Sequence, residues 1–382
     1  MTMTVWVLST YCAAALILHV ASIAMVRTRS RRPPPLADAA GAQAVSIIRP
    51  VCGLDSVEEI TLASTFKLTW PETELLFCVA SAADPAIPVV RGLIATHQHK
   101  NAHILIGDNR ETANPKLNNV IKGWHAARSD WAILADSNLL LPADYVEQLL
   151  GSWSGDAGVV CAPPIGSEPV GFWAEVECGF LNTYQARWQY AADAAGFGFA
   201  QGKTMLWRRA DLDGFGGIAV LGCELAEDAA ATKLVRSCGR RVRLAGPSFK
   251  QPIGERSASQ VISRQTRWAQ LRRRTFPRYF LPEILTGSLP PALAGALASA
   301  LLDGPATAIA LAIVAFWLAA EAALARAAGW PLSWRSPFAW LVRDVLIPFV
   351  WLSAYWASGY EWRGNRISIA GPGAAAMNAG TA

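Results

Sequence analysis

Charged residues are scarce in this chain of 382 residues. Asp, Glu, Lys and Arg make up 16% of it and hydrophobic residues 52%, whereas a soluble globular domain usually has about 25% charged residues. This shortage excludes an ordinary soluble protein, and we expect part of the chain to lie in lipid. The net charge of +5 comes largely from two basic segments next to hydrophobic ones, 27–32 and 264–278. Membrane contact therefore explains it, and no nucleic acid partner is needed.

The sequence also lacks paired cysteines and internal repeats. Its seven cysteines form no C-x-x-C pair, so we interpret those of the central region as reduced packing residues. No fixed period recurs, which excludes a solenoid. His97, His99 and His103 have no second group of ligands nearby, and a solvated loop is favoured over a metal site.

The N-terminal region contains the first long hydrophobic run. Val5 to Val26 carries no charge, and at 1.5 Å per helical residue it is long enough to cross a hydrocarbon core of roughly 30 Å. The basic residues follow the run instead of preceding it, which argues against a cleaved signal peptide. Residues 1–32 are therefore predicted to be a spanning helix with a cytoplasmic basic flank, with the N-terminus outside.

Hydrophobic runs return in residues 281–360. Three further spans are predicted there, with Asp303 and Gly304 in an outer turn and the C-terminus outside; the runs are Leu289–Leu302, Pro305–Ala320 and Val345–Ala357. The last run is also compatible with a re-entrant or interfacial element. Residues 361–382 are predicted to be a tail.

Residues 44–280 have the composition of a soluble α/β domain. Short β-rich runs alternate with helical patterns such as Asp144–Trp153 and Phe172–Tyr190, and this order predicts a mostly parallel sheet. The predicted strands are Val45–Ile48, Leu75–Ala80, His103–Ile106, Trp131–Ala135, Gly158–Ala162, Thr204–Trp207 and Arg241–Leu244.

The first candidate site follows the strand Trp131–Ala135. Asp136 and Asn138 lie on the same side of an extended chain, at the carboxyl end of a strand, where open α/β sheets bind ligands. Their oxygens suit Mg²⁺ or Mn²⁺ that also contacts a diphosphate. An ordinary loop after a strand is the alternative.

Two further segments suggest nucleotide contacts. Asp84 follows a predicted strand and can bind the base or ribose of a nucleotide, although a proline turn also explains it. Lys116 precedes a helix expected to start near Val120, where it can bind phosphate oxygens. Capping of that helix by Asn118 or Asn119 is compatible with this use.

A candidate general base opens the predicted helix at Ala229–Arg236. Asp228 can accept the proton of an acceptor hydroxyl in a glycosyl transfer with inversion, a reaction that needs one carboxylate. Acidic residues are also common in a first helical turn, where they complement the helix dipole.

A basic segment precedes the C-terminal hydrophobic region. If it is helical, Arg264, Arg267 and Arg274 share one face; we assign the first two to a leaving diphosphate and the later arginines to anionic lipid headgroups. Trp268 is predicted either to line the donor pocket or to anchor the chain at the membrane interface.

Taken in order, these motifs resemble those of the ceramide glucosyltransferases. The resemblance runs from about Val45 to Pro282, and the membrane segments extend it over nearly the whole chain. The motifs that carry it are Asp84-Pro85-Ala86, Asn114-Pro115-Lys116-x-Asn118-Asn119, Asp136-Ser137-Asn138, Ala226-Glu227-Asp228 and Arg264-x-x-Arg267-Trp268.

The resemblance implies a GT-A-type nucleotide-sugar-binding domain that transfers glucose from UDP-glucose to the primary hydroxyl of ceramide, with inversion and a divalent metal. It assigns Asp84 and Asp136 to the first two aspartate motifs and Asp228 to the third, as base. Arg264, Arg267 and Trp268 form the (Q/R)xxRW signature, and Gly202 lies near the acceptor side. The chain departs from the family in having Ser81-Ala82-Ala83 where relatives usually carry further acids, and Asn138 for the second acid of D-x-D.

Several alternatives remain open at this stage. The sugar can be galactose or N-acetylglucosamine, and the acceptor a hopanoid or diacylglycerol. A processive polysaccharide synthase would need more spans, and a membrane protein that only binds nucleotide-sugar or lipid is a further possibility. The aromatic stretch Gly171–Tyr190 either guides the lipid or is a core helix. The expected location is a membrane, the bacterial inner membrane, with the catalytic domain in the cytoplasm.

Overall fold

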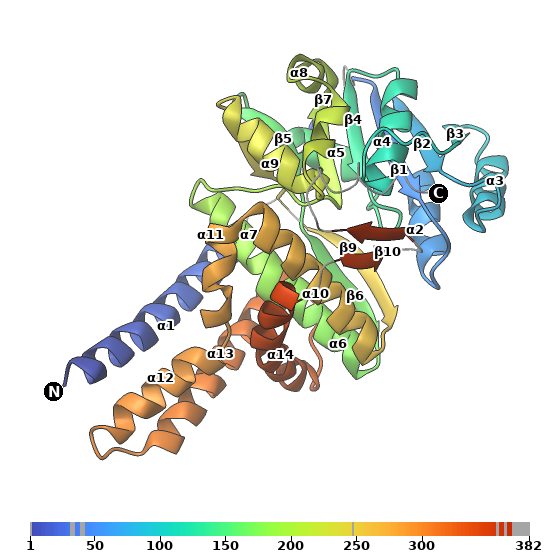
Figure 1. Cartoon of the computed structure of the whole chain (residues 1–382). Helices are drawn as coiled ribbons and strands as arrows, with labels where there is room; N and C mark the ends of the chain where they lie inside the picture. Colours follow the sequence, from blue (N-terminus) through green and yellow to red (C-terminus); the bar gives the residue numbers. More distant parts are fainter. Residues whose placement is uncertain are drawn as a thin grey trace, which may run out of the picture.

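The computed structural model describes residues 2–30, 35–38, 43–246, 248–356, 359–362 and 365–368. It shows an α/β domain from which apolar helices project (Figure 1). The predicted tail at 361–382 falls largely outside the described residues, as do two arginines of the N-terminal basic flank, Arg31 and Arg32.

All seven predicted strands form one sheet, in the order β3-β2-β1-β4-β7-β5-β8. Neighbouring strands are parallel except that β7 runs antiparallel to both β4 and β5. The predicted fold class, a mostly parallel α/β sheet with apolar helices at both ends of the chain, is therefore confirmed. The strands are β1 Val45–Val51, β2 Thr73–Val79, β3 Asn101–Ile106, β4 Trp131–Ala135, β5 Ala157–Cys161, β7 Thr204–Arg208 and β8 Arg241–Leu244.

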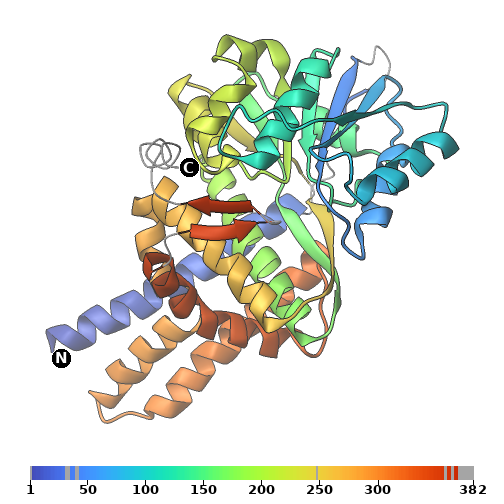
Figure 2. The ribbon, with the colours of Figure 1, turned by 45° about the vertical axis from the view of Figure 1, so that its right-hand side comes forward.

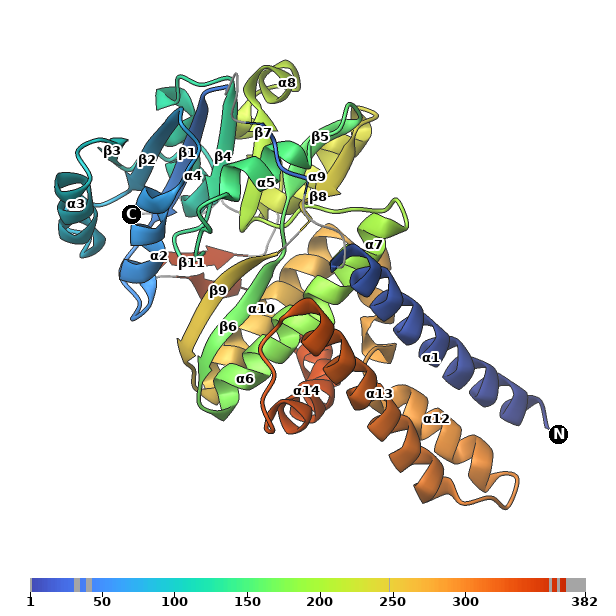
Figure 3. The same cartoon turned by 180° about the vertical axis from the view of Figure 1, so that it is seen from behind.

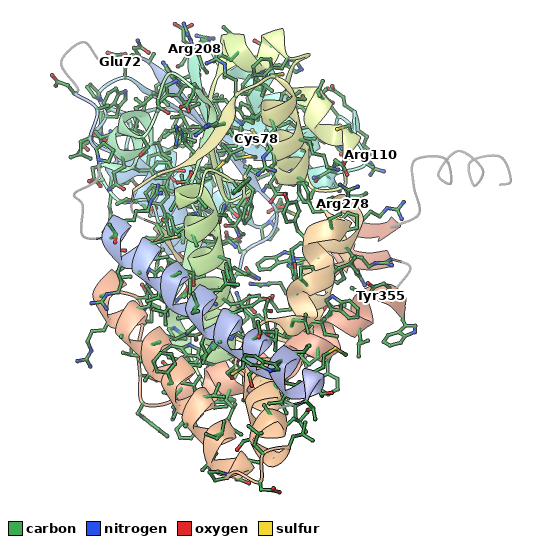
Figure 4. The ribbon with its side chains drawn as sticks, turned by 90° about the vertical axis from the view of Figure 1, so that its left-hand side faces the viewer. Glu72, Cys78, Arg110, Arg208, Arg278 and Tyr355 are labelled. Carbon is green, nitrogen blue, oxygen red and sulfur yellow. The ribbon has the colours of Figure 1, made fainter. Side chains whose placement is uncertain are left out.

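The strands bury both of their faces because successive side chains alternate between two cores. Ile48 and Leu134 belong to one core, with Trp124 of a covering helix, whereas Ile47 and Ile133 belong to the other. Figure 4 shows Cys78 inside this domain. The helices connecting the strands are α2 Glu58–Ser64, α3 Ala86–Thr96, α4 Pro115–Ala126, α5 Tyr145–Gly151, α8 Arg209–Gly214 and α9 Glu227–Ser237, with short 3₁₀ turns at Thr65–Lys67 and Ile218–Cys223.

Helix α4 begins five residues earlier than predicted. Its first residue is Pro115, and the Asn114 side chain caps it by accepting from the backbone N–H groups of Lys116 (3.0 Å) and Leu117 (3.2 Å). Proline suits the first helical position because the N–H that it lacks would have no partner there. Asn118 is therefore not the cap, and its Oδ1 instead accepts from the backbone N–H of Thr112.

A second, two-stranded sheet was not predicted. It pairs β6 (Pro164–Val170) in parallel with β9 (Phe249–Glu255). Proline and glycine interrupt both strands, and these residues have low β-propensity. The sheet leads into α6 (Phe172–Gly179), which continues as a π-helical segment (Phe180–Ala186) and α7 (Arg187–Ala194). Figure 1 shows α10 (Ala258–Thr275) beside α6.

Three of the described helices are long and apolar enough to cross a membrane: α1 (Met3–Ser30), α13 (Ala306–Ala328) and α14 (Ser336–Trp356). The first of the three predicted C-terminal spans forms only the 12 residues of α12 (Leu289–Ala300), about 18 Å of helix, and is too short to be a span by itself. Two short helical turns, α11 (Pro277–Phe280) and η4 (Leu281–Leu285), precede it. Figures 1 and 3 show α1, α12 and α13 projecting together from the α/β domain.

A buried polar network ties these helices to the domain. Arg343 of α14 pairs with Glu321 of α13 (3.0 Å) and donates to the Thr183 hydroxyl of the π-helical segment (2.6 Å). Arg187 of α7 donates to the Ser22 hydroxyl of α1 (2.6 Å). Since a buried charge without a partner is costly, these pairs specify how the helices sit against one another.

The cysteines are all free. Cys78, Cys161 and Cys178 are buried, as predicted for packing residues, but Cys223 and Cys238 are exposed. The prediction is wrong for these two because Cys223 is the last residue of the 3₁₀ turn and Cys238 follows the last residue of α9, where the ends of these elements are exposed.

Candidate active site

The candidate site lies where the central strands end. Asp136 follows β4, and Lys116 stands in the first turn of α4. The Lys116 ammonium is 2.6 Å from Asp136 Oδ1 and 2.6 Å from Glu227 Oε1, while Lys203 Nζ is 2.8 Å from Asp136 Oδ2. Two carboxylates and two ammonium groups from four separate segments therefore meet at one edge of the sheet.

The two lysines keep Asp136 ionised. Burial alone would raise the pKa of this carboxyl, but the neighbouring Lys116 and Lys203 outweigh that effect and lower its pKa to about 2. The two carboxylates likewise raise the pKa of Lys116 despite its burial. Asp136 and Lys116 thus form a charged cluster at neutral pH.

Asp228 stands next to Glu227 in the first turn of α9. Its Oδ2 accepts from the Gly202 N–H (3.0 Å) and its Oδ1 from the Ala229 N–H (2.8 Å). Burial, and then the negative charge of Glu227, raise the pKa of Asp228 to about 6. A carboxyl with this pKa is ionised at neutral pH, yet it is a stronger base than an ordinary aspartate.

The backbone of Gly202 contacts both Lys116 and Asp228. Its carbonyl accepts from Lys116 Nζ (2.7 Å), and its N–H binds Asp228. A Cβ at this position would lie 2.7 Å from Glu227 Oε1. A side chain in this turn before β7 would displace the Glu227 carboxylate, which gives a physical reason for a glycine here.

Arg264 reaches the site from α10. It pairs with Glu177 of α6 at 3.0 Å, and the Glu177 side chain is fully buried. Burial raises the pKa of Glu177, with the Arg264 charge opposing that rise. The Arg264 charge also contributes to the lowered pKa of Lys203, after the larger effect of burial. Arg264 therefore has its ion pair with Glu177 and adds positive charge near Lys203.

Two other predicted residues, Asp84 and Trp268, make contacts outside this network. Asp84 closes the loop after β1 by accepting from the Gly53 N–H (2.9 Å), and it also accepts from the Ala86 N–H (2.9 Å). Trp268 packs on the apolar side chains between α6 and β9, including Ile253. Arg267 is half-buried on the same helix, α10.

The structure adds residues that the sequence reasoning missed. Lys203 and Glu177 make the contacts just described, and Glu227, named above only as part of a motif, pairs with Lys116. Arg49 is fully buried in β1 and donates to the carbonyls of Asp136 (2.8 Å), Ser137 and Leu139, which fixes the loop after β4. A single arginine inside an apolar strand was the available signal, because arginine is almost never buried without a partner.

The predicted metal ligands fit a cation. Lys203 Nζ lies between Asp136 Oδ2 (2.8 Å) and Asn138 Oδ1 (3.1 Å), so a positive charge already bridges the two oxygens. In the described part of the chain no group of three or more His, Cys, Asp or Glu side chains gathers to hold a metal. A divalent ion here would take its remaining ligands from a diphosphate and water, as Mg²⁺ commonly does.

Fold and site together define an α/β protein with a charged site at the carboxyl edge of its sheet and apolar helices beside it. The family model described as glycosyl transferase family 21 matches residues 5–375. The chain belongs to this family, and it is a glycosyltransferase in a membrane.

Two curated relatives and one solved structure are similar to this chain. Ceramide glucosyltransferase 1 of Caenorhabditis elegans is 27% identical over 332 residues, which cover 85% of this chain and 71% of that protein. The ceramide glucosyltransferase of Komagataella phaffii is 39% identical over 101 residues, 25% of this chain and 20% of that one. A mannosyltransferase from Pyrobaculum calidifontis, solved with GDP-Man and Mn²⁺, has a TM-score of 0.46 and 18% identity, covering 90% of this chain and 99% of that chain.

Proposed function

We propose that the chain transfers glucose from UDP-glucose to the primary hydroxyl of ceramide with inversion, giving glucosylceramide. The proposal rests on the placement of Asp228, a carboxylate with a raised pKa, beside the charged cluster of Asp136 and Lys116. Membership of family 21 and the names of the relatives support the sugar and the acceptor. In this proposal the α/β domain is a GT-A-type nucleotide-sugar-binding domain.

Asp136 and Asn138 would hold a divalent metal at the donor diphosphate, where it would supply positive charge against the leaving group. Lys116 and Lys203 add cationic donors beside Asp136, and Arg264, which pairs with Glu177, would supply a further one. A diphosphate carries enough negative charge to draw Lys203 from Asp136, since charge-assisted hydrogen bonds to phosphate oxygens are strong.

The remaining predicted residues have supporting roles in this proposal. Asp84 fixes the loop after β1 that would face the uridine or ribose. Arg267 would add a second guanidinium to the diphosphate, and Trp268 would support the helix that carries both arginines.

Asp228 acts as the base. The acceptor hydroxyl oxygen forms a bond to the anomeric carbon as the bond from that carbon to the diphosphate breaks, and UDP leaves. The hydroxyl proton passes to a carboxylate oxygen of Asp228. Attack opposite the leaving group inverts the configuration, so one base is enough.

The reaction would take place at the inner face of a bacterial inner membrane. UDP-glucose would enter from the cytoplasm and ceramide from the bilayer. Three apolar helices of spanning length support the membrane location.

The base assignment is tested by Asp228→Asn. In lipid nanodiscs with UDP-glucose and ceramide, we expect turnover to fall by about 10²-fold to 10⁴-fold, the usual contribution of a general base. Glu224→Gln is the matched control, because this nearby carboxylate pairs with Lys233 instead of the site. Unchanged turnover of the Asp228→Asn variant would remove the proposed base.

Other products would redirect the proposal. Mass spectrometry of lipids from a host that expresses the chain would show a different hexose or a different lipid backbone. Consumption of UDP-sugar without any lipid product, or binding without consumption, would contradict a lipid transferase.

A further inference from the structure

Helix α14 differs from α1 and α13 in how much of its surface packs against the α/β domain. Its buried side chains, among them Ala339, Trp340 and Ile347, face α6 and α10 of the α/β domain. Gly179 of α6 permits this approach, because a Cβ there would lie 2.8 Å from Trp340 Cδ1. One side of α14 is thus packed against the domain along most of its length.

Both ends of α14 are bonded to that domain. Near the start, Ser336 donates its hydroxyl to Glu175 of α6 at 3.3 Å. Near the end, the Ser353 hydroxyl lies 3.1 Å from Thr266 Oγ1 of α10, and Trp351 Nε1 donates to the carbonyl of Phe280. A helix that crosses a bilayer must extend roughly 30 Å away from such a domain. Helix α14 instead stays packed against the domain.

Helix α10 itself is unsuited to lipid. It carries Arg264, which pairs with the buried Glu177, and its last turn holds three more arginines, Arg272–Arg274. A charged side chain in the bilayer centre is costly. A helix that follows α10 side by side therefore lies outside the hydrocarbon centre as well.

The opposite side of α14 is apolar and exposed. Phe338, Val345, Phe349, Leu352 and Trp356 are separated by seven, four, three and four residues, which places them on one face of a helix. Phe349 is 63% exposed and Trp356 77% exposed. A large apolar stripe of this kind is not left in water by a soluble domain.

We propose that α14 lies in the membrane surface, with this stripe inserted among the lipids of one leaflet, instead of crossing the bilayer. The occupant of the stripe is lipid because the neighbouring bundle of α1, α12 and α13 already places the molecule in a membrane (Figure 2). Amphipathic helices lie at this depth, about 5–10 Å into the headgroup and acyl boundary.

The position of the following segment agrees with a surface helix. The strands β10 (Gly359–Trp362) and β11 (Asn365–Ser368) lie on the sheet side of α14 in the three ribbon views (Figures 1–3). Figure 4 places Tyr355 between the α/β domain and the projecting helices, on the same side of the molecule as Arg278. The chain after α14 is thus on the catalytic side, whereas a crossing helix would put it on the other side.

Spin-label depth measurements test the proposal. Single cysteines at the five stripe positions would be labelled in full-length protein in nanodiscs, after Cys52, Cys223 and Cys238 are changed to serine. We expect all five labels at one shallow depth. Each label should collide with dissolved oxygen more often than with a water-soluble nickel chelate. Depths that rise to the bilayer centre and fall again along the helix would overturn the proposal. Labels shielded from both lipid and water would also overturn it, because they would mean a protein partner.

A labelling experiment provides an independent readout. Asn365→Cys should react with a membrane-impermeant maleimide from the same side as the native exposed Cys223, and from the side opposite to Asp303→Cys in the α12–α13 turn. If Asn365→Cys instead shares its accessibility with Asp303→Cys, α14 crosses the bilayer. Neither measurement depends on which sugar or lipid the enzyme uses.

Discussion

At the scale of single residues, burial and neighbouring charges set the pKa of each carboxylate. Asp136 and Asp228 are the same residue type at one sheet edge, but two lysines lower the pKa of the first to about 2, whereas burial and Glu227 raise the second to about 6. Environments that separate the pKa values of neighbouring acids are typical of acid–base catalysis. The contrast supports the proposed roles, in which Asp136 stays an anion and Asp228 takes the proton.

The raised pKa of Asp228 predicts a pH dependence. The base must be deprotonated to accept a proton, and protonation below pH 6 therefore removes it. We expect kcat/KM to be nearly constant above pH 7 and to fall about tenfold per pH unit well below pH 6. A pH series at saturating lipid measures this, with Glu224→Gln as the control that keeps the same profile. A flat profile from pH 5 to pH 8 would show that no group with this pKa takes the proton.

Glu177 is predicted to position Arg264. Glu177→Gln keeps the shape but removes the charge that pairs with the guanidinium at 3.0 Å. Loss of a charged hydrogen bond is worth about 1.5–3 kcal/mol, so we expect the KM for UDP-glucose to rise at least tenfold with a smaller change in kcat. Initial-rate kinetics separate the two constants.

Glu175→Gln is the control for that variant. Glu175 is on the same helix but binds Ser333 and Ser336, and its substitution should leave the donor KM unchanged. A similar KM change in both variants would point to a general effect on α6.

Local motifs pointed to some residues of the charged cluster and not to others. Asp136, Asp228 and Lys116 stand at strand and helix ends that the chain order reveals. Lys203 and Glu177 acquire their roles only from partners 67 and 87 residues away in sequence, Asp136 and Arg264. No short pattern records such a pairing.

At the scale of elements, close helix packing is set by small residues. Gly179 and Gly92 are both helical glycines, and replacing either by alanine raises helix propensity by about 1 kcal/mol. At Gly92 the new Cβ meets nothing within 4 Å, but at Gly179 it lies 2.8 Å from the Trp340 ring.

We therefore predict opposite signs for these two substitutions. Gly179→Ala should lower thermal stability, because overpacking costs about 1–3 kcal/mol, whereas Gly92→Ala should be neutral or stabilising. Thermal unfolding in detergent, followed by intrinsic tryptophan fluorescence, compares them. Equal midpoints would mean that α6 and α14 do not pack as described.

Elements were predictable where the local pattern is strong. The seven apolar strands of the large sheet were found from their composition and spacing. Strands β6 and β9 were missed because proline and glycine hide their extended form. The start of α4 was misplaced because Pro115 looks like an interruption, although it is the first residue of the helix.

At the scale of the whole molecule, hydropathy predicts which segments meet lipid but not how they are oriented. The runs in α13 and α14 are both long enough to span. Their difference lies in tertiary contacts: α14 is bonded at both ends to the α/β domain. The sequence is compatible with a last hydrophobic segment that either spans the membrane or lies at its surface. The contacts of α14 with the α/β domain favour the surface position.

In the proposed reaction a water-soluble donor has to meet a lipid acceptor. Helix α10, which carries Arg264, packs against α14, the helix that we propose to lie in the membrane surface. The polar diphosphate and the lipid hydroxyl would then approach from opposite sides of the layer that α10 and α14 form.

The central claim is that one carboxylate, Asp228, drives a transfer with inversion to a lipid hydroxyl. The most direct measurement is the anomeric configuration of the product, by proton NMR of the glycolipid that the purified enzyme forms from α-linked UDP-glucose and ceramide in nanodiscs. The account predicts a β-linked glucosylceramide, which the Asp228→Asn variant fails to form. An α-linked product, or the same β-linked product at the same rate from that variant, would contradict it.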